Sequence, residues 1–339
     1  MSVKILAIET SCDETAVAVV ENGRDVLINE VLSQIDIHKE FGGVVPEVAS
    51  RYHMEGIIPL IEKALKGASL TLDDIDAVAV TNGPGLIGAL LVGVSVAKAL
   101  AFALGKPLIA VNHLSGHIYA NFLENEINFP SVTLIVSGGH TDLIYMENHL
   151  EFQVLGQTRD DAAGEAFDKI ARSLKLGYPG GPIVDKMANS GEDNLGFPRV
   201  YLEKGSLDFS FSGLKSAVIN YLHNQKQKGL QVKIEDVCAS FQQAVVEVLV
   251  DKTIECAKQK NVKHVMMAGG VSANSSLRSL MKERTIKNNL NLYYPPLKYC
   301  TDNAAMIGAV AYYQFIAQDF APLDLNAFST MTLDNVYKK

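Results

Sequence analysis

The chain has 339 residues, of which 48% are hydrophobic and 20% are charged, and its formal net charge is −8. These values are ordinary for a globular protein with a large core. They exclude an intrinsically disordered chain, and the length favours two domains. An acidic balance argues against a general nucleic-acid binder, which normally carries a basic stripe. It still allows a nucleic-acid substrate that a local basic patch or a partner protein holds.

The cysteines and the N-terminus point to one compartment. The four cysteines lie far apart and form no CxxC pair, so a disulfide framework is not expected. The apolar run at the start of the chain meets Glu9 too early for a signal peptide. We therefore expect a cytoplasmic protein without disulfides.

Residues 83–104 are apolar enough to raise the question of a membrane-spanning helix. Lys98 lies inside this run, and an uncompensated lysine is costly in lipid. Gly85, Gly88 and Gly93 would let a helix pack closely against a neighbour. These features favour a close-packed buried helix, and we expect no membrane association.

The two halves of the chain open with the same pattern of apolar runs and polar turns. In each half a strand, a short polar turn and a second strand lead through another turn into a third strand; in the first half Asn22-Gly23 marks the second turn. The pattern fits duplicated domains that face one another, and it also fits two unrelated hairpins. The predicted strands are 4–8, 16–20 and 25–29 in the first half and 132–136, 143–146 and 152–155 in the second.

Helical periodicity and short apolar runs fill the rest of each half. Asp160 or Asp161 is expected to cap the helix that follows them. The predicted helices cover 46–65, 89–104, 161–174, 184–190 and 234–260, and further buried strands cover 76–81, 107–111 and 262–268.

Two glycine-rich turns follow predicted strands and are candidates for nucleotide binding. The turn SGGHT (137–141) offers exposed backbone N–H groups beside a hydroxyl and an imidazole, which suits an anion site. In the second turn, Gly269 and Gly270 could flank an adenine ring, and Asn274 could reach a polar edge. Neither turn is of the Walker or Rossmann type, because no GxxxxGK[ST] and no GxGxxG occurs.

The segment after residue 160 adds polar groups to this predicted site. Asp168 is a candidate partner for ribose hydroxyls, although a carboxylate on a helix face is commonly only solvated. Gly180 and Gly181 would let the backbone approach a sugar closely, and Asp185 follows at the start of the next helix.

A metal site is predicted by the motif NHLSGHIYAN. His113 and His117 are four residues apart, so they share one face of a helix and can chelate one divalent ion. Asp302, which precedes an apolar helical run, is the best candidate for the third ligand; Cys300 is a softer alternative. Two histidines and a carboxylate leave open coordination positions for Lewis-acid or iron chemistry. The pair is not HExxH, because position 114 is Leu, and no GxSxG occurs.

Ten motifs between residues 9 and 307 resemble one family, in order and over nearly the whole chain. Single motifs of this kind are weak, whereas the ordered set is highly specific. The chain is similar to the bacterial tRNA N6-adenosine threonylcarbamoyltransferases (TsaD), a family formerly called O-sialoglycoprotein endopeptidases (Gcp). The motifs are ETSCDETAVAV, HKEFGGVVPEVASRYH, NGPGLIGALLVG, NHLSGHIYAN, VSGGHTDL, DDAAGEAFDK, YPGGP, FSFSGLKSA, AGGVSAN and CTDNAAMI.

The resemblance implies an α/β protein with the actin-like ATPase (ASKHA) fold, two duplicated lobes and a nucleotide cleft between them. The expected lobes are 1–125, which carries the two histidines, and 126–339, which carries the adenylate-binding turns and the third metal ligand. The implied reaction transfers a threonylcarbamoyl group from threonylcarbamoyl-adenylate to N6 of adenosine 37 in tRNAs that read codons beginning with A, and releases AMP.

Site residues and partners are carried over by motif. The resemblance assigns one divalent ion, iron or zinc, to His113, His117 and Asp302. It implies TsaB-like and TsaE-like partner proteins, a tRNA substrate and a separate synthase that supplies the adenylate. The residues expected to hold the adenylate, or an ATP-type nucleotide, are Val136, Ser137, Gly138, Gly139, His140, Asp168, Gly181, Asp185 and Asn274.

Two residue hypotheses and two other functions stay open. Glu14, in the first polar turn, is a hypothetical acceptor for the proton of the attacking amine. Lys39, Arg51 and Lys215 are candidates for a local tRNA-binding patch. The other functions are an actin-like ATPase or kinase with a structural metal, and a metallopeptidase.

Overall fold

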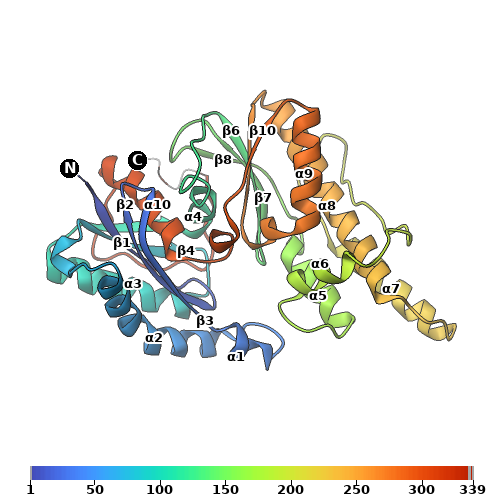
Figure 1. The fold of residues 1–339 in the computed structure, drawn as a ribbon, viewed down its shortest axis with the longest axis horizontal. Helices are drawn as coiled ribbons and strands as arrows, with labels where there is room; N and C mark the ends of the chain where they lie inside the picture. The colour runs from blue at the N-terminus through green and yellow to red at the C-terminus, as the bar shows by residue number, and fades with distance from the viewer. Residues whose placement is uncertain (1, 335–336, 338–339) are drawn as a thin grey trace. The chain divides into compact units, whose positions relative to one another are not determined.

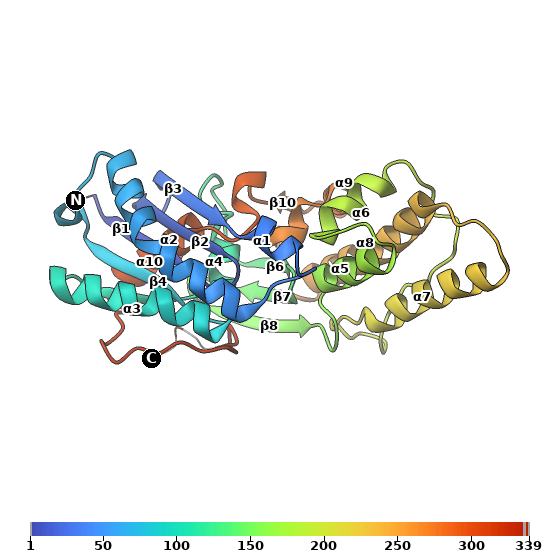
Figure 2. The ribbon, with the colours of Figure 1, turned by 90° about the horizontal axis from the view of Figure 1, so that it is seen from below.

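The computed structural model describes residues 2–334 and 337, and the chain divides into two compact units (Figures 1 and 2). We expected two lobes from the family resemblance, 1–125 and 126–339. In the structure, residues 295–339 return to the first unit. The first unit comprises Met1–Ile127, Asn148–Phe152 and Pro295–Lys339, and the second comprises Asn128–Glu147 and Gln153–Tyr294.

Helix α10 (Ala304–Ile316) explains this return to the first unit. The helix is apolar and mostly buried, and it packs on the first sheet of the chain. A Cβ atom at Gly308 would lie 2.8 Å from Cβ of Val20, so the helix and the sheet are in close contact. Asp302 precedes α10 and therefore lies in the first unit, although we expected it in the second lobe.

The first unit is built on a five-stranded sheet. The strands are β1 (Lys4–Glu9), β2 (Glu14–Glu21), β3 (Asp25–Ser33), β4 (Ala77–Gly83) and β5 (Leu108–Asn112), in the order β3-β2-β1-β4-β5. β1 is antiparallel to β2 and parallel to β4. Asn22 and Gly23 have φ angles of 52° and 70°, as the predicted hairpin turn requires.

The second unit repeats this topology. Its strands are β6 (Ser131–Val136), β7 (Thr141–Met146), β8 (Phe152–Gln157), β9 (His264–Ala268) and β10 (Asn291–Tyr293), in the order β8-β7-β6-β9-β10. β6 is antiparallel to β7 and parallel to β9, just as β1 is to β2 and β4. The shared order favours duplicated domains over two unrelated hairpins.

Helices cover both faces of the first sheet. The strands are buried on both faces, so apolar residues follow one another without alternation. Leu6 and Ile8 face the core formed with α2 and α3, while Ala7 lies near Gly308 of α10. The helices of this unit are α1 (Ile35–Lys39), α2 (Pro46–Gly67), α3 (Ile87–Leu104), α4 (His113–Tyr119) and α10.

The helices of the second unit include one that periodicity did not predict. Helix α7 buries only Leu214 and Val218, so its sequence carries little apolar periodicity. The longest helix, α8, contributes many residues to the core of this unit. The helices are α5 (Ala163–Ser173), α6 (Gly180–Ala188), α7 (Ser212–Gln227), α8 (Ile234–Gln259) and α9 (Ser275–Lys287).

The predicted aspartate cap of α5 is wrong. Ala162 is the N-cap residue, and no side chain caps the helix. Asp160 instead accepts hydrogen bonds from the backbone N–H groups of Phe211 and Ser212 and from both neighbouring serine hydroxyls. An aspartate just before a helix favours an N-cap, but the Asp160 carboxylate instead fixes the start of α7.

Helix α3 buries one face only. Lys98 donates a hydrogen bond to the carbonyl of Leu325, so its charge is not left in an apolar core. Ile87, Leu91 and Phe102 are exposed, and 33% of the helix is buried. Among the described helices, α3 alone is long and apolar enough to cross a membrane. One such helix is weak evidence for a membrane span, because core helices of soluble proteins have the same length and composition. The prediction of a buried helix thus holds for one face.

Acidification is expected to destabilise the first unit through His149. The ring stacks on Tyr313 at 3.8 Å, and its Nδ1 lies 3.0 Å from the hydroxyl of Tyr119. Burial lowers the pKa of His149 to about 4. The unfolded chain therefore binds more protons between pH 6.5 and 4, and stability is lost as the pH falls through this range.

Thermal melts of the wild type and of His149→Phe from pH 7 to pH 4 check this expectation. The phenylalanine keeps an aromatic ring against Tyr313 but cannot titrate, so the melting temperature should fall less steeply on acidification. Parallel pH profiles for the two proteins would contradict the assignment.

Candidate active site

Helix α4 positions the two histidines. It follows β5 directly, and Asn112, the last residue of β5, caps it by accepting hydrogen bonds from the N–H groups of Leu114 (2.8 Å) and Ser115 (3.3 Å). Every residue of the helix is buried. The predicted helix and its spacing are therefore present, and the rings of His113 and His117 lie 4.7 Å apart, nearly perpendicular.

Removing the cap should loosen the helix that carries the histidines. Asn112→Ala deletes the acceptor for two helix N–H groups, and such caps contribute about 0.5–2 kcal/mol. We expect a loss of this size in the free energy of unfolding, measured by urea denaturation. Asn326→Ala, in an exposed loop position, serves as the control and should stay within about 0.5 kcal/mol of the wild type.

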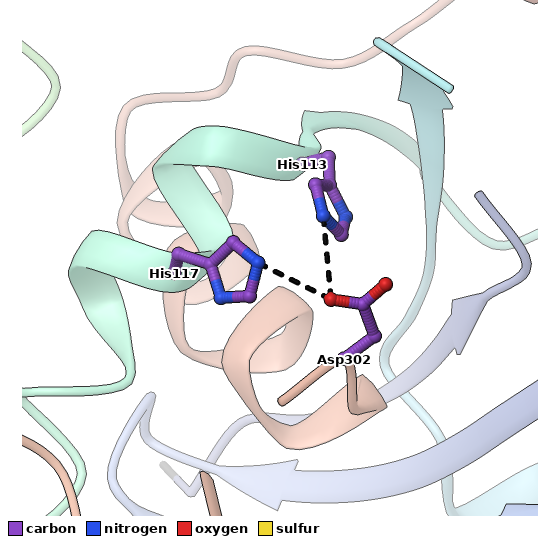
Figure 3. A group of neighbouring side chains, drawn as sticks. All are labelled: His113, His117 and Asp302. Atoms are coloured by element: carbon purple, nitrogen blue, oxygen red, sulfur yellow. Dashed lines mark ion pairs between the residues drawn. The ribbon is translucent and has the colours of Figure 1, made fainter. Parts of the chain in front are cut away.

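Asp302 completes a three-residue group with the two histidines (Figure 3). Its Oδ1 lies 3.5 Å from Nε2 of His113 and 3.2 Å from Nε2 of His117. One candidate ligand atom from each residue lies within 4.8 Å of the other two. Asn303, the next residue, caps α10 and so fixes the loop that presents the carboxylate.

The surroundings of these residues fit a divalent cation. His117 is 1% exposed, and neither of its ring nitrogens makes a hydrogen bond to the described residues, although Nε2 faces the Asp302 carboxylate at 3.2 Å. Buried nitrogens without hydrogen bonds cost free energy unless a ligand is bound. Burial lowers the pKa of His113, but the carboxylates of Asp302 and Glu9 outweigh this and raise it to about 9. The histidine nitrogens can thus act as ligands, and the neighbouring carboxylates supply negative charge that attracts a cation.

Cys300 is not part of this group. Its thiol is buried and points at the carbonyl oxygens of Pro295 and Pro296, at 3.6 Å and 3.5 Å. This position fits a structural cysteine, and the softer alternative for the third ligand gains no support.

Glu14 begins β2 and accepts a hydrogen bond from the hydroxyl of Ser33. Burial, with repulsion from Asp302 and Asp13, raises the pKa of Glu14 to about 10. A cation bound by Asp302 would offset the repulsion that contributes to this rise. The role of Glu14 as a proton acceptor stays a prediction.

In the second unit, the turn between β6 and β7 forms an open glycine surface. Ser137 donates its N–H to the carbonyl of His140 (2.9 Å), and its hydroxyl accepts the N–H of His140 (3.1 Å). A Cβ atom at Gly138 or Gly139 would meet no atom within 4 Å. Val136 ends β6 directly before this turn. The turn thus has the exposed backbone that an anion site needs.

The start of α6 forms a second open surface in the same unit. Asp168 of α5 accepts the N–H of Gly180 at 2.7 Å and so holds the glycine turn. Burial raises the pKa of Asp168, and backbone hydrogen bonds from Gly180 and Gly181 oppose this rise. A Cβ atom at Gly181 would again meet no atom within 4 Å.

Asp185 and Asn274 already have partners in the protein. Asp185 accepts hydrogen bonds from the N–H and the hydroxyl of Ser275. Asn274 caps α9 through Leu277 and donates to the side chain of Gln242 at 2.8 Å. The structure brings these residues together, and their predicted contact with an adenylate stays a prediction.

Two residues near these sites, Glu9 and Gly164, were not predicted from the sequence. Glu9 is fully buried, and its Oε2 lies 3.0 Å from Nδ1 of His113; a charged residue at the end of an apolar strand was the available signal. Burial raises the pKa of Glu9, but His113 outweighs this and holds it below the usual value. An added Cβ atom at Gly164 would lie 2.5 Å from the carbonyl oxygen of Ser137, and a single glycine in a sequence does not signal such a close approach. Gly269, which we expected beside an adenine ring, lies equally close to the carbonyl oxygen of Val136.

The predicted basic patch is partly neutralised. Lys39 pairs with Asp36, and Lys215 pairs with Asp161, each at 2.7 Å. Arg51 is exposed on α2.

Comparison with known proteins identifies the family. The family model described as TsaD, tRNA N6-adenosine threonylcarbamoyltransferase, matches residues 25–309. A protein of that name from Staphylococcus saprophyticus is 60% identical over 330 residues, which cover 97% of this chain and 96% of the relative. One from Halalkalibacterium halodurans is also 60% identical, over 98% of this chain and 96% of its own length.

Solved structures support the fold alone. HypF from T. kodakarensis matches with a TM-score of 0.64 at 14% identity, over 95% of this chain and 49% of its own. Component A of the (R)-2-hydroxyglutaryl-CoA dehydratase from Acidaminococcus fermentans matches with a TM-score of 0.54 at 16% identity, over 92% and 98% of the two chains. These likenesses confirm the actin-like ATPase fold. With near-full-length relatives at 60% identity, the chain belongs to the TsaD family of tRNA N6-adenosine threonylcarbamoyltransferases.

Proposed function

We propose that this chain transfers a threonylcarbamoyl group from threonylcarbamoyl-adenylate to N6 of adenosine 37 in tRNAs that read codons beginning with A. The observation that carries the proposal is the convergence of His113, His117 and Asp302 in a chain of this family. Their geometry suits an acyl transfer, in which negative charge develops on a carbonyl oxygen.

His113, His117 and Asp302 would hold one divalent ion, iron first and zinc as the alternative, since this donor set suits both. The ion would supply Lewis-acid stabilisation of charge on a carbamoyl oxygen. The protein's part is to keep three ligands in place on α4 and on the loop before α10, with the histidines shielded from water. No HExxH glutamate stands at Leu114, so nothing favours peptide hydrolysis.

The open glycine surfaces of the second unit would bind the adenylate. Backbone N–H groups around Ser137–His140 suit a phosphate, and the open side of Gly181 would admit a sugar. Asp168 would accept a hydrogen bond from a ribose hydroxyl, or it would hold the glycine turn at Gly180 against which the ribose lies. Val136 would fix the start of the β6–β7 turn. Asp185 and Asn274 would hold the start of α9 in place beside the adenylate.

The tRNA and the adenylate synthase follow from the proposed reaction, and the partner proteins follow from the family. The substrate is tRNA, a separate synthase supplies the adenylate, and TsaB-like and TsaE-like proteins complete the system in the cytoplasm. AMP is a good leaving group, so the reaction does not demand a strong general acid. With Lys39 and Lys215 paired to aspartates, Arg51 is the remaining candidate of the predicted tRNA patch.

Reconstitution tests the proposal. The chain, TsaB-like and TsaE-like proteins, the synthase, tRNA, threonine, bicarbonate and ATP are incubated, and the tRNA is digested and analysed by mass spectrometry. Threonylcarbamoyladenosine that depends on this chain is the expected product. ATP hydrolysis without modified nucleoside, from protein with its metal bound, would instead support an ATPase or kinase.

A further inference from the structure

We infer that Glu9 is a positioning residue for the metal site. Its carboxylate holds the ring of His113 with the proton on Nδ1, so that Nε2 is the atom offered to the ion. The inference rests on the metal site proposed above and adds a residue that neither spacing nor motif assigns to it.

Three elements fix the Glu9 carboxylate. The residue ends β1 and is 0% exposed. Oε2 lies 2.6 Å from the hydroxyl of Thr81 on β4 and 3.0 Å from Nδ1 of His113 on α4, while Oε1 accepts the backbone N–H of Ser11. Because both oxygens are engaged, the carboxylate cannot rotate freely, and its acceptor faces the imidazole in one orientation.

This contact selects a tautomer of His113. An ionised carboxylate only accepts hydrogen bonds, so Nδ1 must donate, and the lone pair of a neutral ring then sits on Nε2. Nε2 is the nitrogen that faces Asp302, at 3.5 Å. The hydroxyl of Ser11 lies 3.1 Å from Nδ1, but a charge-assisted bond to Glu9 is the stronger of the two.

His117 lacks such a partner. Among the described residues its buried Nδ1 has no hydrogen-bond partner, so only packing and the Asp302 carboxylate beside Nε2 orient its ring. Outer partners of metal-bound histidines commonly contribute 10–100-fold to metal affinity. Glu9 therefore makes His113 the preorganised ligand of the pair.

The test measures Zn²⁺ affinity by chelator competition on the full chain. Glu9→Gln keeps the side-chain volume but removes the negative charge and one acceptor oxygen, so in either amide orientation the charge-assisted bond to Nδ1 of His113 is lost. We expect roughly 10–100-fold weaker binding with an unchanged circular dichroism spectrum. Thr253→Val is the matched control: it removes a buried hydroxyl that bonds only within α8, and it should stay within about threefold of the wild type.

Nitrogen-15 NMR of the Zn²⁺-loaded wild type keeps the inference testable if Glu9→Gln does not fold. The expected spectrum shows His113 protonated on Nδ1 and bound through Nε2; binding through Nδ1 would overturn the inference. Unchanged affinity in Glu9→Gln, or an equal loss in Thr253→Val, would also overturn it. If His117→Ala retains full affinity, the metal site itself fails, which is a separate outcome.

Discussion

Replacing Asp302 by alanine is expected to remove the metal from the purified protein and to lower threonylcarbamoyl transfer by roughly 10²–10³-fold. Oδ1 of Asp302 is the oxygen toward which Nε2 of both histidines points, at 3.5 Å and 3.2 Å. Without it, two neutral imidazoles remain and the anionic ligand is lost. Affinity for a hard or borderline divalent ion should fall accordingly.

The measurement combines metal analysis of anaerobically purified protein with transfer in the reconstituted system. Thr301→Ala is the matched control, because Thr301 is an exposed neighbour in the same loop. It should retain both metal and activity. Asn303 still caps α10 in Asp302→Ala, so the fold should be kept, and circular dichroism checks this. Full metal content in Asp302→Ala would contradict the assigned ligand set.

Much of the fold was predictable because the strands carry local signals. Asn22-Gly23 predicts the first hairpin, and the repeated strand–turn–strand pattern predicts two sheets of one topology. The return of α10 to the first unit was not predictable, because an apolar helix does not indicate which sheet will bury it. Helix α7 was missed because it buries only two apolar side chains.

The metal ligands were predictable for a different reason. A spacing of four residues places His113 and His117 on one helix face whatever the tertiary structure. Asp302 lies almost two hundred positions further along the chain, and the family motif, not geometry, selected it over Cys300. Glu9 could not be found this way, since its role depends on how β1, β4 and α4 meet in space.

Two glycine substitutions in the second unit should separate stability from ligand binding. Gly269 has φ 88° and ψ 165°, a region that other residues avoid, and an added Cβ atom would lie 2.5 Å from the carbonyl oxygen of Val136. Gly269→Ala should therefore destabilise the protein by roughly 3 kcal/mol or more. Gly139→Ala meets open space and should leave the free energy of unfolding within about 0.5 kcal/mol.

AMP binding should be weakened by Gly139→Ala, the substitution that leaves stability unchanged. The space above Gly139 is where the proposed adenylate phosphate approaches the β6–β7 turn, so a methyl group there should weaken AMP binding about tenfold, or 1.4 kcal/mol. Urea denaturation and calorimetric titration with AMP measure the two effects on the same preparations. A Gly139→Ala protein with wild-type stability and wild-type AMP affinity would place the phosphate elsewhere, because backbone approach at this glycine is what the proposed cradle requires.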